Sequence, residues 1–579
     1  MSTFLTAQSL TLSHTTFPLF KDLNFTISQG DKIGIVGHNG CGKSSLLKLL
    51  SNQYEPTEGH VAIANHCLIS YVEQHIPESL KTKTLLEALQ ERLTDCDSWQ
   101  AELLLAELGF VEPDWCMPVV NCSGGQQMRL LLARAIINQP DLLLLDEPSN
   151  HLDLPSLLWL EKFLSSWKSS YIIVSHDQRL LDSATNTTWF MRDQTLLQFS
   201  LPFSQAKEEL LKKDEQDLLR HATEQKEIDR LEKSAKRLAN WGQVYDNENL
   251  ARKAKTMFAR KKRLENEQTE LGEGSPWRLK LHSEALAANR LMEAKPFSVR
   301  PSLEASPLFD ISEFYIKSGD RVAILGSNGC GKSTLLNVLY QNYLNQGQNT
   351  TSAESSIKFH DRVQLGYYDQ SLNQLNDSDT LIRAVRNLSK LPEEQCKHAM
   401  ISAGFKYSQH NEKVISLSGG ERARLLFVAL TLANYHMLFL DEPTNHLDMN
   451  GKDELIETLN NFKGAALLVS HDRNLIENCC NRFWLIHNDV LTEYLSFDDA
   501  YRKICNGALL NSVNEVPSNQ KTEDTGKRMF TNEEGLLERL IELEGLLEDD
   551  LQRKPKHQKP NLQQMWCNEI NSIKSELLI

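Results

Sequence analysis

Hydrophobic and polar positions divide the chain into two apolar-rich segments that flank a charged, helix-forming stretch. KIGIV (32–36) and RVAIL (321–325) are short apolar runs typical of buried strands, and each precedes a glycine-rich loop and an amphipathic run. LLLLD (142–146) and MLFLD (437–441) are two further apolar runs of strand length. Strands that alternate with amphipathic helices predict an α/β fold in both segments.

The two segments are copies of one another. GDKIGIVGHNGCGKSSLL (30–47) returns as GDRVAILGSNGCGKSTLL (319–336), and LLLLDEPSNHLD (142–153) returns in its last eleven positions as LFLDEPTNHLD (438–448). VSHDQRL (174–180) likewise returns as VSHDRNL (469–475). A duplicated domain explains this pattern. We expect a first copy at 1–202, a helical linker at 203–275, a second copy at 276–510 and a tail at 511–579.

GHNGCGKS (37–44) and GSNGCGKS (326–333) both fit the phosphate-binding P-loop pattern, and each lies between a predicted strand and a predicted helix. Glycines let backbone N–H groups close around phosphate oxygens, the lysine reaches the outer phosphates, and the serine hydroxyl binds Mg²⁺. Two copies in this context make an ordinary glycine turn a poor explanation. The predicted nucleotide-binding residues of these loops are Gly37, Asn39, Gly40, Gly42, Lys43, Ser44 and Ser45 in the first copy, and Gly326, Asn328, Gly329, Gly331, Lys332, Ser333 and Thr334 in the second.

Each of the later apolar runs ends in Asp-Glu-Pro. A buried strand that ends in two carboxylates is costly unless those charges have partners. We expect Asp146 and Asp441 to bind Mg²⁺, directly or through water, and Glu147 and Glu442 to polarise the attacking water. A solvated acidic turn could explain one such run, but it explains two with the same neighbours poorly.

Further motifs between and after these runs resemble the ATP-binding-cassette (ABC) ATPases. CSGGQQ (122–127) and LSGGER (417–422) resemble the signature segment, and Asp153 and Asp448 resemble the aspartates of the loop called the D-loop. A lone histidine after a strand is usually structural, but the order and spacing of His176 and His471 after the Asp-Glu-Pro runs match the switch histidines. The remaining residues that the resemblance assigns to the nucleotide are Gln74, Ser123, Gly124 and Gly125, with Gln370, Ser418, Gly419 and Gly420.

The resemblance implies two composite sites for ATP and Mg²⁺ in a head-to-tail sandwich of the two copies within a monomer. In each site the signature of one copy would meet the phosphates held by the other, with Glu147 and His176, or Glu442 and His471, as the catalytic groups. The implied Mg²⁺ ligands are Ser44, Gln74, Asp146, Ser333, Gln370 and Asp441, and no other metal is expected. The aromatic residue that stacks on adenine is missing, because its position holds His14 in the first copy and Leu303 in the second. Base selectivity is therefore open, although Phe17 could substitute in the first copy.

The linker has the pattern of an antiparallel helical hairpin. Residues 204–240 contain neither proline nor glycine and carry leucine and isoleucine near heptad spacing, beginning with Leu211 and Leu218. Trp241-Gly242 is expected to break this first helix, and a second is expected from about Glu248 to Leu271. Between Lys233 and Arg263 there are ten basic residues and two acidic ones, although the whole chain has a net charge of −15. A basic hairpin tip on an acidic body is an electrostatic footprint for phosphate backbone, against the alternative of an ordinary solvated hairpin.

Two cassettes, SNHLD and TNHLD loops and a charged helical linker together resemble the ABC-F family, over nearly the whole chain. That resemblance implies a ribosome-associated translation factor, an ATP hydrolase whose linker at Lys233–Arg263 contacts rRNA and P-site tRNA. The short turn at Trp241–Asn247 favours a housekeeping factor over the alternative of an antibiotic-resistance ribosomal protection protein. A transporter ATPase subunit with a separate membrane partner would need no basic tip, and a DNA-repair ATPase would carry zinc cysteines or inserted coiled coils.

The remaining features indicate a cytoplasmic protein without a membrane domain. No apolar run reaches the length of a membrane-spanning helix, the start MSTFLTAQSL lacks the features of a signal peptide, and the 11 cysteines are scattered. The tail has apolar heptad-like runs around Leu536–Leu551, which predict a short coiled coil.

Overall fold

The computed structural model describes residues 2–13, 18–74, 76–93, 98–150, 152–244, 248–267, 286, 290–301, 305–347, 356–389, 391–445 and 447–511. The predicted adenine-stacking positions His14 and Leu303, together with Phe17, lie outside these residues, as does the tail from 512 onward. The predicted boundaries of the four segments stay predictions.

The first copy is built on two sheets that share a core. The larger sheet has the strand order β5-β6-β7-β3-β8-β9 and is parallel except for β9, and the smaller is antiparallel with the order β2-β1-β4. Its central strands are apolar on both faces, which is the pattern of a sheet covered on both sides. The strand bounds are β1 Thr3–Ser13, β2 Pro18–Ser28, β3 Lys32–Gly37, β4 Glu58–Ile63, β5 Ile69–Val72, β6 Leu142–Asp146, β7 Ser170–Val174, β8 Thr187–Arg192 and β9 Thr195–Phe199.

Helices follow the strands of the first copy. α1 fills the space between its two sheets, where Leu46, Leu47 and Leu50 are buried with Phe20 and Trp189. Because β3, β6 and β7 are parallel neighbours, the loops after them meet at one edge of the sheet. The helix bounds are α1 Lys43–Leu50, α2 Leu85–Gln90, α3 Ser98–Glu107, α4 Gly124–Ile136, α5 Leu154–Ser166 and α6 Gln178–Ala184, with short 3₁₀ turns η1 Glu78–Leu80, η3 Glu112–Cys116 and η4 Val119–Asn121.

The second copy repeats this plan with one larger sheet. Its order is β11-β12-β20-β19-β14-β18-β17-β16, and a second sheet has the order β13-β10-β15. The strand bounds are β10 Met292–Ala294, β11 Phe297–Val299, β12 Phe309–Ile311, β13 Phe314–Ile316, β14 Arg321–Leu325, β15 Ile357–Phe359, β16 Leu365–Tyr368, β17 Met437–Asp441, β18 Ala465–Val469, β19 Arg482–His487 and β20 Val490–Tyr494. The helix bounds are α9 Lys332–Gly347, α10 Leu381–Ser389, α11 Glu393–Ser402, α12 Gly419–Leu432, α13 Met449–Asn461, α14 Arg473–Cys479 and α15 Phe497–Asn511, with 3₁₀ turns η5 Tyr407–Asn411 and η6 Val414–Ser416.

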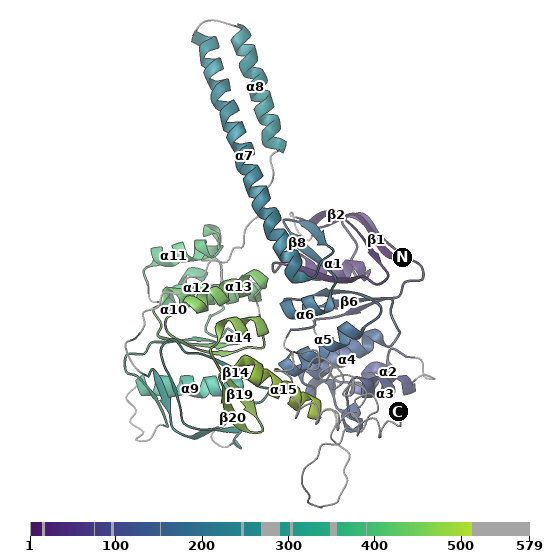
Figure 1. Cartoon of the computed structure of the whole chain (residues 1–579), viewed down its shortest axis with the longest axis vertical. Helices are drawn as coiled ribbons and strands as arrows, with labels where there is room; N and C mark the ends of the chain where they lie inside the picture. The colour runs from purple at the N-terminus through teal and green to yellow at the C-terminus, as the bar shows by residue number, and fades with distance from the viewer. Residues whose placement is uncertain are drawn as a thin grey trace, which may run out of the picture. The chain divides into compact units, whose positions relative to one another are not determined.

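The linker forms the predicted helical hairpin, and Figure 1 shows its helices α7 (Phe203–Val244) and α8 (Glu248–Glu267) side by side. The prediction that Trp241-Gly242 breaks the first helix is wrong, because α7 continues to Val244. A glycine lowers helix stability by only about 1 kcal/mol, so it need not end a helix that is long and packed against another. Leu211 and Leu218 are exposed, so the apolar seam begins further along α7 and reaches full burial at Ile228 and Ala235.

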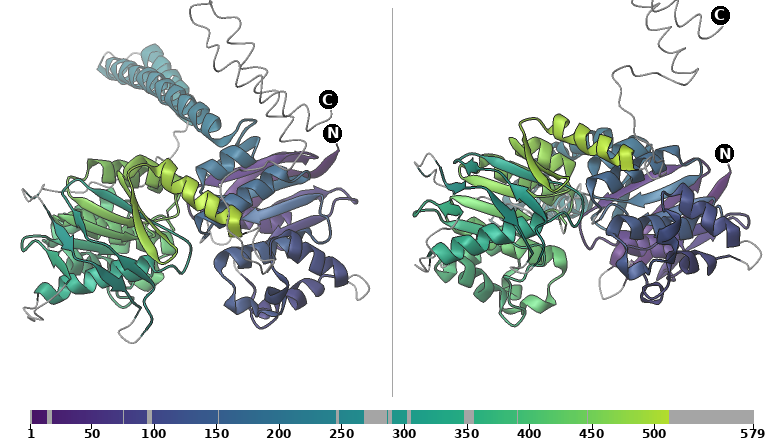
Figure 2. Two further views of the ribbon diagram at one scale, coloured as in Figure 1. Left: turned by 60° about the horizontal axis from the view of Figure 1, so that its bottom comes forward. Right: turned by 90° about the horizontal axis from the view of Figure 1, so that it is seen from below.

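The two copies contact each other through helices near their switch histidines. α14 of the second copy packs near α6 of the first, and α15, the yellow-green helix in Figure 2, contacts α5 of the first. The base of α7 bonds to both copies. Its Asp214 pairs with Arg192 of the first copy, and its Lys207 pairs with Asp453 of the second copy at 2.5 Å. Among the helices in the described ranges, none is long and apolar enough to cross a membrane.

Candidate nucleotide-binding sites

The first phosphate loop has the backbone that its glycines allow. Gly40 and Gly42 have φ values of 83° and 98°, in the left-handed region that favours glycine. A Cβ at Gly42 would also lie 3.2 Å from the Phe20 ring, so the space there is closed. α1 begins directly after Gly42, which leaves its first N–H groups without partners inside the helix. The Lys43 ammonium donates to the Gly37 carbonyl at 2.8 Å and is held at this helix start.

The second phosphate loop repeats this geometry. Gly329 and Gly331 have φ values of 81° and 100°, and α9 begins at Lys332. Lys332 Nζ donates to the carbonyl oxygens of Gly326 and Ser327, at 2.9 Å each. Both loops therefore present a lysine ammonium and a helix N-terminus at the same place, which is the arrangement that anionic phosphate groups fit.

The aspartates that end β6 and β17 lie against the serines of these loops. Ser44 Oγ donates to Asp146 Oδ1 and Ser333 Oγ to Asp441 Oδ1, both at 3.0 Å. Burial raises the pKa of Asp146, and it raises the pKa of Asp441 to about 6. A buried carboxylate beside a hydroxyl is an oxygen donor set that suits Mg²⁺, and a bound cation would offset the cost of burying this charge. The predicted serine–aspartate pairs thus fit the metal.

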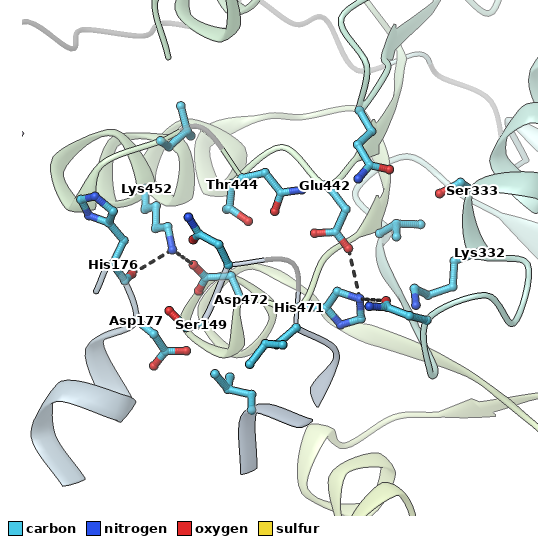
Figure 3. Close-up of a pocket in the computed structure, with 18 of the residues that line it drawn as sticks. Ser149, His176, Asp177, Lys332, Ser333, Glu442, Thr444, Lys452, His471 and Asp472 are labelled. Atoms are coloured by element: carbon cyan, nitrogen blue, oxygen red, sulfur yellow. Dashed lines mark hydrogen bonds and ion pairs between the residues drawn. The ribbon is translucent and has the colours of Figure 1, made fainter. Parts of the chain in front are cut away.

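The glutamates that follow have an unusual backbone. Glu147 and Glu442 have φ values of 49° and 48°, a left-handed conformation that costs a non-glycine residue roughly 1–3 kcal/mol and persists only where the surroundings impose it. In each copy the glutamate N–H donates to a strand carbonyl, that of Val174 at 2.9 Å or Val469 at 2.8 Å. The turn directs each carboxyl group toward the histidine of the same copy, and Figure 3 shows this for Glu442 and His471.

Each glutamate is held close to a histidine and a polar amide. His176 Nε2 lies 3.6 Å from Glu147 Oε1, and His471 Nε2 lies 3.4 Å from Glu442 Oε1. Gln74 Nε2 donates to Glu147 Oε2 at 3.2 Å, and the side chain of Asn150 donates to the same oxygen. The structure therefore brings together the predicted glutamine, glutamate and histidine of the first copy.

Burial sets the protonation of these groups. It raises the pKa of Glu147 and raises that of Glu442 to about 8, and it lowers the pKa of His176 well below its usual range and that of His471 to about 3. Both histidines are therefore neutral near pH 7, so neither contact with a glutamate is an ion pair. Both ring nitrogens of His176 are buried and lack a hydrogen-bond partner among the described residues. A ligand oxygen could satisfy them.

Residues of both copies line one cavity of about 390 Å³, shown in Figure 3. Asp153 of the first copy accepts a hydrogen bond from the Asn328 N–H of the second phosphate loop at 3.1 Å, and Asn328 Oδ1 lies 3.0 Å from His471 Nε2. The lining is Ser149, Asn150, Leu152, Leu157, His176 and Asp177 from the first copy, with Asn328, Gly329, Gly331, Lys332, Ser333, Thr334, Gln370, Glu442, Thr444, Asn445, Leu447, Lys452, Val469, His471 and Asp472 from the second.

The signature segments have a different place in this structure. Ser123, Gly124 and Gly125 are described but do not line the cavity around the second phosphate loop. Ser123 instead caps α4 by accepting from the N–H of Gln126, and Ser418 caps α12 in the same way. Their predicted contact with the phosphates of the opposite site stays a prediction.

Sequence reasoning missed two functional-site neighbours. The Tyr71 hydroxyl donates to Asp146 Oδ2 at 3.0 Å, and its signal was its position three residues before Gln74 on an apolar strand. Lys452 lines the cavity and reaches the His176 backbone of the other copy. Its signal was a difference between the copies, because the repeat places Leu157 at the corresponding position.

Two phosphate loops, each with a serine–aspartate pair and a following glutamate beside a histidine, define a tandem ATPase of the ATP-binding-cassette class. A family model described as ABC transporter matches residues 20–150 and 309–445. The chain is 30% identical over 555 residues to the probable ATP-binding protein YheS of Haemophilus influenzae, covering 90% of this chain and 84% of that protein. The chain belongs to the ABC-F family.

Two other relatives support this assignment, and a solved structure shows the fold. The ribosome protection protein VmlR of Bacillus subtilis is 31% identical over 500 residues, covering 83% of this chain and 86% of that protein. ABC transporter F family member 4 of Arabidopsis thaliana is 29% identical over 568 residues, covering 86% and 76%. The archaeal ribosome recycling factor aABCE1, solved with the stalk protein aP1, has a TM-score of 0.58 at 17% identity and covers 86% of this chain and 92% of that chain, which shows the shared fold.

Proposed function

We propose that this chain binds ATP with Mg²⁺ at both sites, hydrolyses it, and acts on ribosomes in the cytoplasm through the α7–α8 hairpin. Lys43 and Lys332 would hold the outer phosphates, and the Ser44–Asp146 and Ser333–Asp441 pairs would hold Mg²⁺. Bound Mg²⁺ would neutralise charge that develops on the phosphates during hydrolysis.

The proposed hydrolytic step uses the glutamate and histidine of each site. Glu147 and Glu442 would orient a water toward the outermost phosphate as carboxylates, and the neutral His176 and His471 would donate an N–H to a phosphate oxygen. Burial favours the protonated form of each glutamate. Bound Mg²⁺ and the phosphate-loop lysine, Lys43 or Lys332, would oppose burial and favour the ionised form. Gln74 is placed to hold the carboxylate of the first site through its bond to Glu147.

The observation that carries the ribosomal partner is the exposed positive charge on the hairpin of an ABC-F chain. Arg252, Lys253 and Lys255 on α8 are exposed, as are Lys233 and Arg237 on the facing part of α7. Exposed cations on a helix pair bind phosphate backbone, as rRNA or tRNA presents it. A relative is named as a ribosome protection protein, which supports the same partner and adds antibiotic protection as a second candidate role.

The structure also shows that the hairpin uses part of its charge internally. Lys261 pairs with Glu232 at 3.0 Å and Arg260 with Glu227 at 3.4 Å. Reversing these two cations would place like charges together and loosen the hairpin itself. Arg252, Lys253 and Lys255 are therefore better positions at which to test RNA binding.

The test is cosedimentation with ribosomes of the Glu147→Gln, Glu442→Gln double variant in the presence of ATP and Mg²⁺. We expect this variant to bind ATP without hydrolysing it, to accumulate on ribosomes and to block translation in a cell-free reaction. Adding charge reversals at Arg252, Lys253 and Lys255 should remove it from the ribosome pellet.

The matched control reverses three exposed lysines on the two copies, Lys21, Lys295 and Lys358, which changes the net charge by the same amount. This control should still sediment with ribosomes. A double variant that binds ATP yet stays off ribosomes would refute the ribosomal partner. Restored growth of a sensitive strain by the wild-type chain under a ribosome-targeting antibiotic would favour the second candidate role over a housekeeping one.

A further inference from the structure

Lys452, on α13 of the second copy, reaches into the first copy at its switch histidine. Its Nζ donates to the backbone carbonyl of His176 at 2.9 Å and pairs with Asp472 Oδ2 of its own copy at 2.7 Å. The side chains of Lys452 and Asp472 are only 14% and 10% exposed, so both contacts are shielded from water. Figure 3 shows Lys452 between His176 and Asp472. A charged hydrogen bond in such a setting is stronger than one on the surface.

A second cation from the same copy holds the next residue. Arg473, whose side chain is 3% exposed, pairs with Glu161 at 2.9 Å and with Asp177 at 3.4 Å. Glu161 and Asp177 both belong to the first copy. Two consecutive residues of the first copy, His176 and Asp177, are thus held by two cations of the second copy.

The arrangement is not reciprocal. By the repeat, Lys452 corresponds to Leu157 of the first copy and Arg473 corresponds to Gln178, both of which are uncharged. Leu157 lines the cavity that holds the second phosphate loop. His471 of the second copy is held differently. Its Nε2 lies 3.0 Å from Asn328 Oδ1, and the backbone N–H of Asn328 donates to the Asp153 carboxylate. The two sites therefore differ in how their histidines are fixed.

We propose that Lys452 is a positioning residue of the first site, supplied by the second copy, which fixes the backbone of His176 beside Glu147. Hydrolysis at the first site then depends on contact between the copies, and the second site has no equivalent lysine. This inference rests on the proposed hydrolysis of ATP. It predicts unequal turnover at two sites whose phosphate loops and carboxylates are nearly identical.

The test compares Lys452→Met, which keeps the length of the side chain and removes its charge, with Lys452→Arg, which keeps the charge. We expect Lys452→Met to lower kcat by about tenfold with a smaller change in KM, because a displaced catalytic group slows the chemical step more than it weakens binding. Lys452→Arg should recover most of that loss. The control is Lys207→Met, which makes the same chemical change in another ion pair between the linker and the second copy.

Single-site backgrounds locate the effect. In a Glu442→Gln background, where turnover comes from the first site, Lys452→Met should cause the full loss. In a Glu147→Gln background it should cause little further loss. A wild-type kcat for Lys452→Met, no recovery with Lys452→Arg, or an equal loss in both backgrounds would overturn the proposal. If one glutamine variant abolishes all turnover, the proposal is still tested by comparing Lys452→Met with Lys452→Arg in the chain that keeps both glutamates.

Hydrogen exchange separates this inference from the proposed function. Lys452→Met should speed amide exchange in residues 175–178 by about tenfold, with Lys452→Arg and Lys207→Met close to wild type, because a buried charged hydrogen bond to this loop is lost. This readout needs no ATP turnover. Unchanged exchange in Lys452→Met would count against the positioning role, whereas a wild-type chain that hydrolyses no ATP would count against the proposed function.

Discussion

The buried Glu442 should make the nucleotide-free protein less stable as the pH rises, and the Glu442→Gln substitution tests this. Burial raises its pKa from 4.5 to about 8. Below pH 4.5 the side chain is neutral in the folded and unfolded chains. As the pH rises toward 8, the unfolded chain releases this proton and the folded chain keeps it, so stability falls through this range. Glu442→Gln removes the group and with it this loss.

The magnitude follows from the size of the pKa change. At about 1.36 kcal/mol per pKa unit, the buried carboxylate lowers the free energy of unfolding by about 5 kcal/mol above pH 8. The side chain is 9% exposed, so solvent screens little of this effect. For a domain of this size the difference corresponds to a change in Tm on the order of 10 °C.

The assay is thermal denaturation of both proteins from pH 5 to pH 9 with EDTA and without nucleotide. The Tm of Glu442→Gln should exceed that of wild type by a margin that grows with pH. Glu457→Gln, a change at an exposed position of α13, is the control and should follow wild type throughout. A margin that is constant or shrinks as the pH rises would refute the reasoning from burial.

Two further predictions concern the phosphate loop and the metal pair. Gly331→Ala should lower the free energy of unfolding by about 1–3 kcal/mol and abolish ATP binding at the second site. The residue has φ +100°, and an added Cβ would lie 2.8 Å from a leucine methyl group. The control Gly319→Ala, at φ +87° in open space, should destabilise the protein less and leave ATP binding, measured by calorimetry, intact. Tyr71→Phe should raise the Mg²⁺ concentration needed for ATP binding at the first site by about tenfold, because Asp146 loses a hydrogen bond of about 1–2 kcal/mol. Tyr367 is the corresponding residue of the second copy, and its ring stacks on Tyr340. An equal effect of Tyr367→Phe at the second site would therefore contradict this prediction.

Local sequence patterns predicted the parts of the site that lie within one stretch of chain. The apolar runs became β3, β6, β14 and β17, with the strand bounds close to those expected. Parallel neighbours in a sheet bring their carboxyl ends to one edge, which is why a serine after β3 meets an aspartate at the end of β6. Such contacts follow from general rules of the α/β fold. The family resemblance then assigned the chemistry.

Contacts between distant segments could not be predicted in the same way. The left-handed backbone of Glu147 and Glu442 is a property of a turn that the whole fold imposes, and glutamate itself disfavours it. The bond from Lys452 to the other copy depends on how two domains meet, which no periodicity encodes. The end of α7 was misplaced because packing against a second helix outweighs the local effect of Gly242.

The root of α7 has a mechanical consequence. Phe203 and Ala206 are buried in the core of the first copy, and the next residue, Lys207, is paired with Asp453 of the second copy. A helix of 42 residues is about 63 Å long, so a tilt of about 5° at this root displaces its far end by about 5 Å. Any change in the spacing of the two copies would therefore be magnified along the helix, so α7 has the geometry of a lever whose fulcrum lies between the two copies.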